Sequence, residues 1–217
     1  TGTLPDLVLY ASSTFADVPF PAEGIQNFGS GATFDSAFTG DSTFSPVFSV
    51  ISGDGYGEGV QVAFLAVTGY GAGFADGYST FNAKVKGSPD GRIEIKLIGN
   101  GADSVAEVDL KTYSGATALG DDWYEVAVPF SAFSNAANIP GHSGWLLGPP
   151  GDQGDVPFTF LLTDIGFSED DSGLDGGEDA AGESAATPTL VLYASSGDVD
   201  LPFPAAGIQD FGSGATL

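Results

Sequence analysis

The stretch YSTFNAKVKGSPDGRIEIKLIG, residues 78–99, decides the fold class of this chain. Apolar and polar residues alternate over residues 81–86 and again over residues 92–97. This period of two is typical of β-strands that have one buried and one solvent-facing side. Between them, SPDG at residues 88–91 carries Pro and Gly where a tight turn needs them. We therefore predict that the two strands pair as a hairpin.

Further strand patterns follow along the chain, separated by connections rich in Gly, Pro and Asp. Some alternate in the same way, and others are continuously apolar, as central strands are. About ten short strands of this kind predict an all-β fold, a two-sheet antiparallel β-sandwich (jelly roll). We expect it to span residues 1–168. The other candidate strands are residues 7–11, 33–38, 46–51, 60–67, 108–111, 123–130 and 158–167.

The chain repeats itself over a long interval. LVLYASS occurs at residues 7–13 and again at residues 190–196, and FGSGAT occurs at residues 28–33 and 211–216, with a constant offset of 183. Repeats one domain apart are typical of tandem modules rather than of a solenoid. We therefore expect a second copy of the same module to begin at residue 190 and to be truncated at Leu217.

An acidic segment, residues 169–189, separates the two copies. It contains no aromatic residue and only one large aliphatic residue, Leu174. Such a segment cannot bury enough apolar surface to offset its ordering entropy, so we predict an extended linker. Because the two copies begin almost identically, residues 190–195 are also expected to exchange with residues 7–11 of another molecule.

The charge of the chain narrows its partners. Twenty-nine acidic residues stand against five basic ones, which gives a formal net charge of −24. Such a chain repels phosphate backbones and anionic membranes, so we expect no nucleic-acid or membrane partner. Adaptation to salty water explains this charge, and calcium binding is a second explanation that can coexist with it. The absence of Cys excludes disulfides and thiolate metal sites.

The order of several segments resembles a known family. VAEVDLKTY at residues 105–113, GDDWYEVAVPFSAFS at 120–134 and FTFLLTDIGFSE at 158–169 follow the opening stretch. Together they resemble carbohydrate-binding modules of the galactose-binding-like β-sandwich type. The resemblance implies a non-catalytic polysaccharide-binding module of a secreted protein, as in marine bacteria that degrade algal or plant polysaccharides. It also implies a structural calcium ion, to which Asp164 in the last strand would contribute.

Aromatic side chains supply the candidate binding residues, because aromatic rings stack on the apolar faces of sugars. Trp145 and His142 lie in a glycine-rich segment, residues 142–148, which we expect to be a loop. Trp123 falls on the solvent-facing phase of its strand. For the two tryptophans, packing within the sandwich is the alternative. Three tyrosines in other glycine-rich segments complete the set of aromatic candidates: Tyr56, Tyr70 and Tyr78.

Basic residues gather on one side of the predicted hairpin. Lys84, Lys86, Arg92 and Lys96 all fall on its solvent-facing phase. A patch for an anionic polysaccharide is one interpretation, with Lys84 and Lys96 as binding residues. Pairing with neighbouring acidic residues is the other.

Catalysis finds little support in the sequence. The single histidine, His142, has no nucleophile-elbow pattern beside it, and pairs of carboxylates are inevitable among 29 acids. We therefore predict that the chain is not an enzyme. The expected function is binding of a neutral or weakly charged polysaccharide, such as an algal or plant β-glucan. The alternative is a spacer repeat of a calcium-dependent extracellular adhesin.

Overall fold

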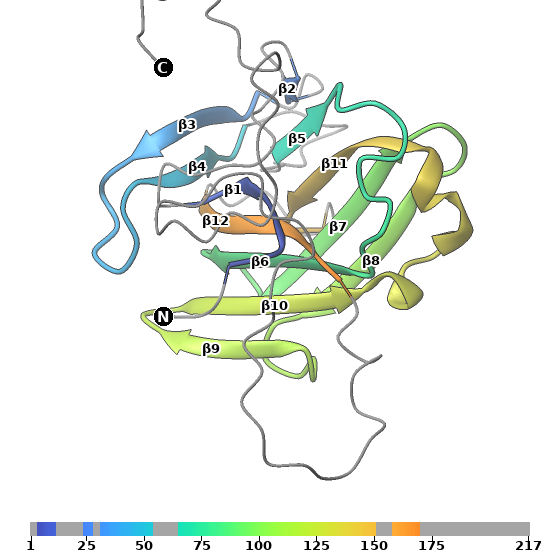
Figure 1. Cartoon of the computed structure of the whole chain (residues 1–217). Coiled ribbons are helices and arrows are strands. Elements are labelled where there is room, and N and C mark those ends of the chain that lie inside the picture. Colours follow the sequence, from blue (N-terminus) through green and yellow to red (C-terminus); the bar gives the residue numbers. More distant parts are fainter. Residues whose placement is uncertain (1–3, 12–23, 28–30, 54–64, 151–157, 170–217) are drawn as a thin grey trace, which may run out of the picture. The chain divides into compact units, whose positions relative to one another are not determined.

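Two antiparallel β-sheets packed face to face form the described part of the chain (Figure 1). The computed structural model describes residues 4–11, 24–27, 31–53, 65–150 and 158–169. The predicted antiparallel β-sandwich is confirmed. Two compact units are distinguished, Thr1–Gly173 and Leu174–Leu217, and the second lies wholly outside the described residues. The predicted linker, second copy and strand exchange therefore remain predictions.

The larger sheet has seven strands in the order β3-β4-β12-β6-β10-β9, with β1 also paired to β12. We call it the large sheet. Its strands are β1 (Leu7–Tyr10), β3 (Thr33–Phe38), β4 (Val47–Ile51), β6 (Thr80–Lys86), β9 (Ala116–Gly120), β10 (Trp123–Pro129) and β12 (Thr159–Ser168).

The smaller sheet has five strands in the order β2-β5-β11-β7-β8, and we call it the small sheet. Two short 3-10 turns, η1 (Phe130–Ala132) and η2 (Ala136–Gly141), connect β10 to β11. No described helix is long and apolar enough to cross a membrane. The strands are β2 (Ile25–Gln26), β5 (Leu65–Thr68), β7 (Arg92–Gly99), β8 (Ser104–Asp109) and β11 (His142–Gly148).

The predicted hairpin of residues 81–97 is wrong. Strand β6 pairs with β10 and β12 in the large sheet, whereas β7 pairs with β8 and β11 in the small sheet. The SPDG turn does form, and the Gly91 N–H donates to Ser88 O over 3.2 Å. It carries the chain from one sheet to the other, because alternation fixes which side of a strand is buried but not its partner.

The predicted loop at residues 142–148 is also wrong, since these residues form β11 between β5 and β7. Glycine serves close packing here. A Cβ atom on Gly144 would collide with the carbonyl oxygen of Val67 in β5. A glycine inside a strand allows such an approach, which the composition alone does not distinguish from a loop.

The main core lies between the sheets, where every inward side chain of β6 and β7 is buried. Phe167 in β12 lies at the centre of a cluster of aromatic rings in the main core. Its ring contacts those of Phe74, Phe81 and Phe130 in edge-to-face geometry, with centroids 5.3, 5.9 and 5.7 Å away. Fully burying a ring of this size contributes about 1.5–3 kcal/mol, so this packing stabilises the fold.

A second, smaller core lies on the outer face of the large sheet. Val47, Trp123 and Leu161 are buried there, with Phe38 and Phe44 packed against them. Phe38 is the last residue of β3, and Phe44 lies in the connection between β3 and β4. This connection therefore covers part of a sheet face that the sequence pattern assigns to solvent.

Candidate functional site

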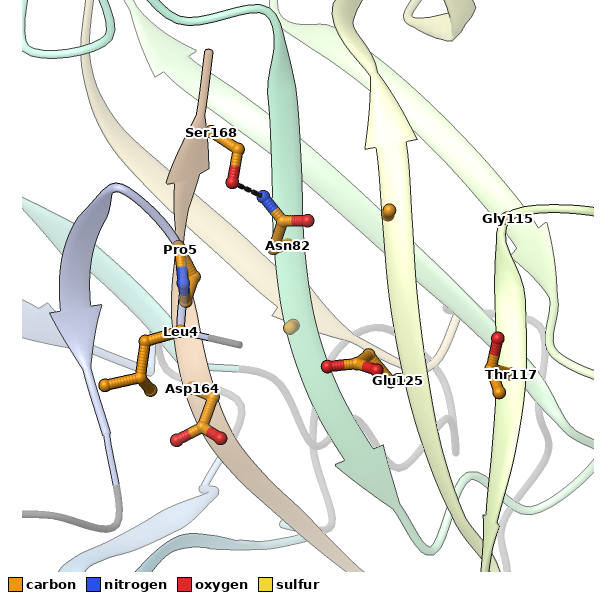
Figure 2. Close-up of a pocket in the computed structure, with 10 residues that line it drawn as sticks. Leu4, Pro5, Asn82, Gly115, Thr117, Glu125, Asp164 and Ser168 are labelled. Carbon is orange, nitrogen blue, oxygen red and sulfur yellow. Dashed lines mark hydrogen bonds between the residues drawn. The ribbon is translucent and has the colours of Figure 1, made fainter. Parts of the chain in front are cut away.

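The outer face of the large sheet carries a pocket of about 200 Å³ (Figure 2). We call it the outer-face pocket. Asn82 of β6 and Glu125 of β10 lie on its floor, Leu4 and Pro5 form one wall, and Thr117 of β9 lines the opposite side. Polar side chains on the floor and apolar ones on a wall make the pocket amphipathic.

Strand phase explains why these side chains reach the pocket. Tyr124 and Val126 of β10 point into the main core, so Glu125 between them points outward. In the antiparallel register Glu125 faces Lys84 on β6 and Thr117 on β9. Three neighbouring strands thus bring polar groups to one place.

Asp164 reaches the same pocket through an irregularity in β12. Its φ angle is 49°, and the register between β12 and β6 shifts between Thr163 and Gly166. A non-glycine residue in the left-handed region is uncommon, although Asp tolerates it better than most. Backbone strain of this kind concentrates at functional sites. Here it directs the Asp164 side chain onto the outer face.

Lys84 joins the two carboxylates of the pocket. Its Nζ lies 2.5 Å from Asp164 Oδ2 and 3.6 Å from Glu125 Oε1, and the Thr163 hydroxyl donates to Asp164 Oδ1. The Lys84 side chain is 4% exposed and that of Asp164 is 9% exposed, whereas that of Glu125 is 35% exposed. Figure 2 shows the Glu125 carboxylate directed across β6 toward Asp164. The cation is enclosed, and Glu125 offers an acceptor to the pocket.

The rest of the pocket pairs hydrogen-bonding groups with apolar surface. The Asn82 amide donates to Ser168 Oγ over 2.9 Å, as Figure 2 shows. Leu4 is 43% exposed, which leaves an apolar side chain free on the wall. A Cβ atom on Gly115 would collide with the carbonyl oxygen of Ala127, so glycine lets β9 approach β10 closely at this edge.

Trp123 does not line this pocket. It is fully buried in the outer-face core, and its Nε1–H donates to Asp41 Oδ1 over 3.1 Å. Burial alone would raise the pKa of Asp41, but hydrogen bonds from Phe44 N–H, Lys86, Thr43 N–H and Trp123 together hold that pKa below its usual value. The predicted exposure of Trp123 is wrong because the β3–β4 connection covers it.

Trp145 and His142 are also fully buried, on the inner face of β11. Trp145 Nε1 donates to the Tyr70 hydroxyl over 3.4 Å, and His142 Nε2 lies 2.9 Å from Ser104 Oγ. Neither side chain can stack on a ligand at the surface. The prediction that they contact sugar from a loop is therefore corrected: they pack the sandwich interior.

The predicted tyrosines do not gather at the pocket. Tyr70 stacks on Phe74, with ring centroids 5.0 Å apart and planes 7° from parallel. Burial raises the pKa of Tyr70 to about 12, against the opposing effect of the Trp145 hydrogen bond. Tyr78 packs against Phe167 with ring centroids 6.0 Å apart. Both are half-buried at the edge of the main core, and Tyr56 lies outside the described residues.

The predicted basic patch is divided between two sheets, so that prediction is wrong. Lys84 and Lys86 lie on the large sheet, whereas Arg92 and Lys96 lie on the small sheet. Each is paired with acid: Lys86 Nζ lies 2.9 Å from Asp41 and from Asp121, Arg92 Nε lies 2.7 Å from Asp90, and Lys96 Nζ lies 2.8 Å from Glu94. Pairing with neighbouring acids is thus the interpretation that the structure supports.

Calcium remains an untested prediction. Within the described ranges no group of three or more His, Cys, Asp or Glu side chains is arranged to hold a metal ion. The Asp164 carboxylate is instead bound by Lys84 and Thr163.

Sequence reasoning missed Leu4, Asn82, Thr117 and Glu125 as residues of a site. The alternating pattern places Asn82 and Glu125 on the solvent-facing side of their strands. Many other polar residues share this feature, so it does not single these two out.

Comparison with known proteins supports the architecture. No family model and no curated protein matches this chain. Among solved structures, the family 11 carbohydrate-binding module of the cellulosomal cellulase Lic26A-Cel5E of Clostridium thermocellum superposes with a TM-score of 0.51. The identity is 12%, over 78% of this chain and 97% of that one. The chain has the β-sandwich fold of a carbohydrate-binding module.

Two further carbohydrate-binding modules match with lower scores. The family 30 module of the C. thermocellum cellulase Cel9D-Cel44B has a TM-score of 0.43 and 15% identity, over 78% of this chain and 96% of that one. A family 28 module specific for non-crystalline cellulose has a TM-score of 0.42 and 13% identity, over 76% and 97%.

Proposed function

We propose that this chain is a non-catalytic carbohydrate-binding module and that its outer-face pocket binds a neutral polysaccharide. One observation carries the proposal. The pocket is lined by polar side chains and an apolar wall, while Lys84, the cation that pairs with both of its carboxylates, is enclosed between them. A sugar ring presents the same combination, with hydroxyl groups at its edge and C–H groups on its faces.

The charge of the pocket favours a neutral ligand over an anionic one. Glu125 and Asp164 would repel a uronic acid or a sulfated sugar, and Lys84 is already paired with both. The formal net charge of −24 adds to this repulsion over longer distances. Carboxylate and amide oxygens accept hydrogen bonds from hydroxyl groups, as a neutral β-glucan would offer.

The binding mode relies on hydrogen bonds and aliphatic contacts more than on aromatic stacking. The two tryptophans are buried, so Leu4 and Pro5 supply the apolar surface in the pocket. Ser104 and His142 are hydrogen-bonded in the manner of a catalytic pair, but both are buried and neither lines the pocket. This arrangement favours binding without catalysis.

At a coarser level, the fold suits a module that attaches a secreted protein to a polysaccharide. Tandem copies, as the sequence repeat predicts, would increase avidity by raising the effective concentration of sites. The same repeat favours a second candidate, a spacer of an extracellular adhesin in which calcium stiffens the acidic linkers.

Affinity gel electrophoresis of the full chain tests the proposal. The gels contain laminarin, mixed-linkage β-glucan, xylan, agarose or alginate, each with calcium or with chelator. We expect retardation by a neutral glycan, not by alginate, and at least tenfold weaker retardation of the Glu125→Gln and Asn82→Ala variants. Glu107→Gln, the same change on the exposed face of the small sheet, is the matched control.

Equal retardation of Glu125→Gln and the wild type would show that the glycan does not bind in the outer-face pocket. No retardation by any glycan, together with a melting temperature that rises in calcium, would support the adhesin spacer instead.

A further inference from the structure

A second pocket, of about 240 Å³, lies at one end of the sandwich. We call it the end pocket. The β6–β7 crossover contributes Ser88 and Pro89, the segment after β8 contributes Lys111, the β9–β10 turn contributes Asp122, and β10 contributes Tyr124. Three stretches of the chain, residues 87–91, 110–111 and 122–124, thus meet around one hollow.

Lys111 differs from the other basic residues of the chain. Lys84, Lys86, Arg92 and Lys96 each form an ion pair with a carboxylate, whereas no carboxylate among the described residues lies within ion-pair distance of Lys111. With 29 acids against five bases, a cation without a partner is unexpected. Lys111 is exposed and lines the end pocket, so its ammonium group is available to a ligand.

The position of Lys111 is supported by Gly91. A Cβ atom on Gly91 would lie 3.2 Å from Lys111 Cε, so the glycine leaves room for the aliphatic stem to lie across the turn. Gly91 also has a φ angle of 82°, which disfavours any other residue. The turn therefore leaves room for the lysine stem to lie over it.

Asp122 and Tyr124 complete the chemistry of the end pocket. Asp122 is exposed, has a φ angle of 59°, and forms no hydrogen bond or ion pair within the described part of the chain. Tyr124 is half-buried, with its ring against the edge of the main core, and Leu110 beside it is buried. The lining thus carries one free donor, one free acceptor and an aromatic and aliphatic surface.

The end pocket is separate from the outer-face pocket. Tyr124 and Glu125 are consecutive in β10, and side chains of consecutive strand residues point to opposite faces. Tyr124 lines the end pocket from the core side of the large sheet, whereas Glu125 lines the outer-face pocket. A ligand in one does not occupy the other.

We propose that the end pocket is a second carbohydrate subsite, which holds one neutral sugar residue; this rests on the carbohydrate-binding function proposed above. Its free charges, Lys111 and Asp122, cancel, so it favours neither a cationic nor an anionic ligand. A sugar residue both donates and accepts hydrogen bonds through its hydroxyl groups, which suits a lining that carries a free ammonium and a free carboxylate. Its C–H face suits the Tyr124 ring and Pro89. With two subsites, a module can hold two glycan chains at once.

Titration of the ¹⁵N-labelled full chain with cellohexaose, laminarihexaose and xylohexaose, followed by amide NMR, tests this subsite. We expect saturable shifts of the Gly91, Lys111, Asp122 and Tyr124 amides that persist in Glu125→Gln. In Lys111→Met, which keeps the stem over Gly91, and in Asp122→Asn, which keeps the left-handed backbone, the Kd from these amides should rise at least tenfold. Lys96→Met is the matched control, because that lysine is paired on the small sheet.

Shifts confined to Asn82, Thr117 and Glu125 would overturn the end pocket and leave the outer-face pocket standing. Shifts confined to the amides of the end pocket would overturn the outer-face pocket as a binding site and leave the end pocket standing. A Kd unchanged in both Lys111→Met and Asp122→Asn, or no shift with any of the three sugars, would also overturn the second subsite.

Discussion

Lys84 and Asp164 are 80 residues apart in sequence, yet Lys84 Nζ lies 2.5 Å from Asp164 Oδ2 on the outer face of the large sheet. Both side chains are nearly excluded from solvent. The Asp164 side chain reaches this position because the backbone of β12 turns into the left-handed region there. One ion pair thus links the strained residue of β12 to the floor of the proposed binding pocket.

Lys84→Met should destabilise the fold strongly, because it leaves the buried Asp164 carboxylate without its cation. The expected loss in the free energy of unfolding is about 3–5 kcal/mol. Urea denaturation at neutral pH measures it. Lys96→Met removes a more exposed pair, Lys96–Glu94, and should cost about 0–1 kcal/mol. Equal losses in the two variants would show that the Lys84–Asp164 pair is not buried as described.

Trp123→Phe should reduce stability without reducing glycan binding. It removes the indole N–H that donates to Asp41, a hydrogen bond to a charged group that is worth about 1.5–3 kcal/mol. Asp41 keeps its bonds from Lys86 and from two backbone amides. Thermal melting and affinity gels on the same samples measure both properties. Unchanged melting with lost retardation would instead make Trp123 a ligand contact.

His142 should make stability depend on pH in the neutral range. The Ser104 hydroxyl donates to Asn135 O, so it accepts from His142 Nε2–H and leaves Nδ1 as a buried, unpartnered acceptor. Burial lowers the pKa of His142, although Asp103 opposes this effect. The unfolded chain therefore binds the proton more readily, with a pKa of about 6.5.

The contribution of a neutral His142 is thus complete above about pH 6.5 and is lost as the pH falls toward the lowered pKa of the folded state. In urea denaturation between pH 5.5 and 7.5, the stability difference between wild type and His142→Gln should narrow as the pH falls. The many carboxylates are present in both proteins, so their contribution to the pH dependence cancels in the difference between the two free energies of unfolding. A difference that stays constant over this range would show that His142 titrates normally in the folded protein.

Gly166→Ala should loosen β1. Gly166 faces Val8 of β1, and a Cβ atom there would collide with the carbonyl oxygen of Leu7 and with Pro5. We expect a loss of about 1–3 kcal/mol and faster hydrogen exchange of the β1 amides. Gly141→Ala is the control, since the nearest atom to its Cβ would be 3.6 Å away and its backbone is ordinary. Equal exchange of β1 in both variants would contradict this packing.

Several of the strands could be predicted well from the sequence. Residues 33–38 form β3 as predicted, the predicted segment 46–51 differs from β4 by one residue at its start, and 158–167 differs from β12 by one residue at each end. Alternation also identified the buried side of β7 correctly. These features are local, because side-chain polarity along a strand follows which face is covered by the core.

The candidate site could not be predicted in the same way. Trp145 was expected in a loop because it lies among glycines, but those glycines allow close packing of strands and Trp145 lies inside the sandwich. Trp123 was assigned to the solvent side, which is the correct face of β10, but that face is covered by the β3–β4 connection. A local pattern contains no information about which distant segment covers a face.

The sequence by itself determined the fold class, the buried phase of most strands and the repeat at residues 7–13 and 190–196, because each depends on residues close together or on direct identity. Only the tertiary structure decided that β6 and β7 lie in different sheets, that four of the five basic residues are neutralised, and that Lys84 meets Asp164. Strand pairing and ion pairing join residues far apart along the chain, and their geometry exists only after the sheets have formed.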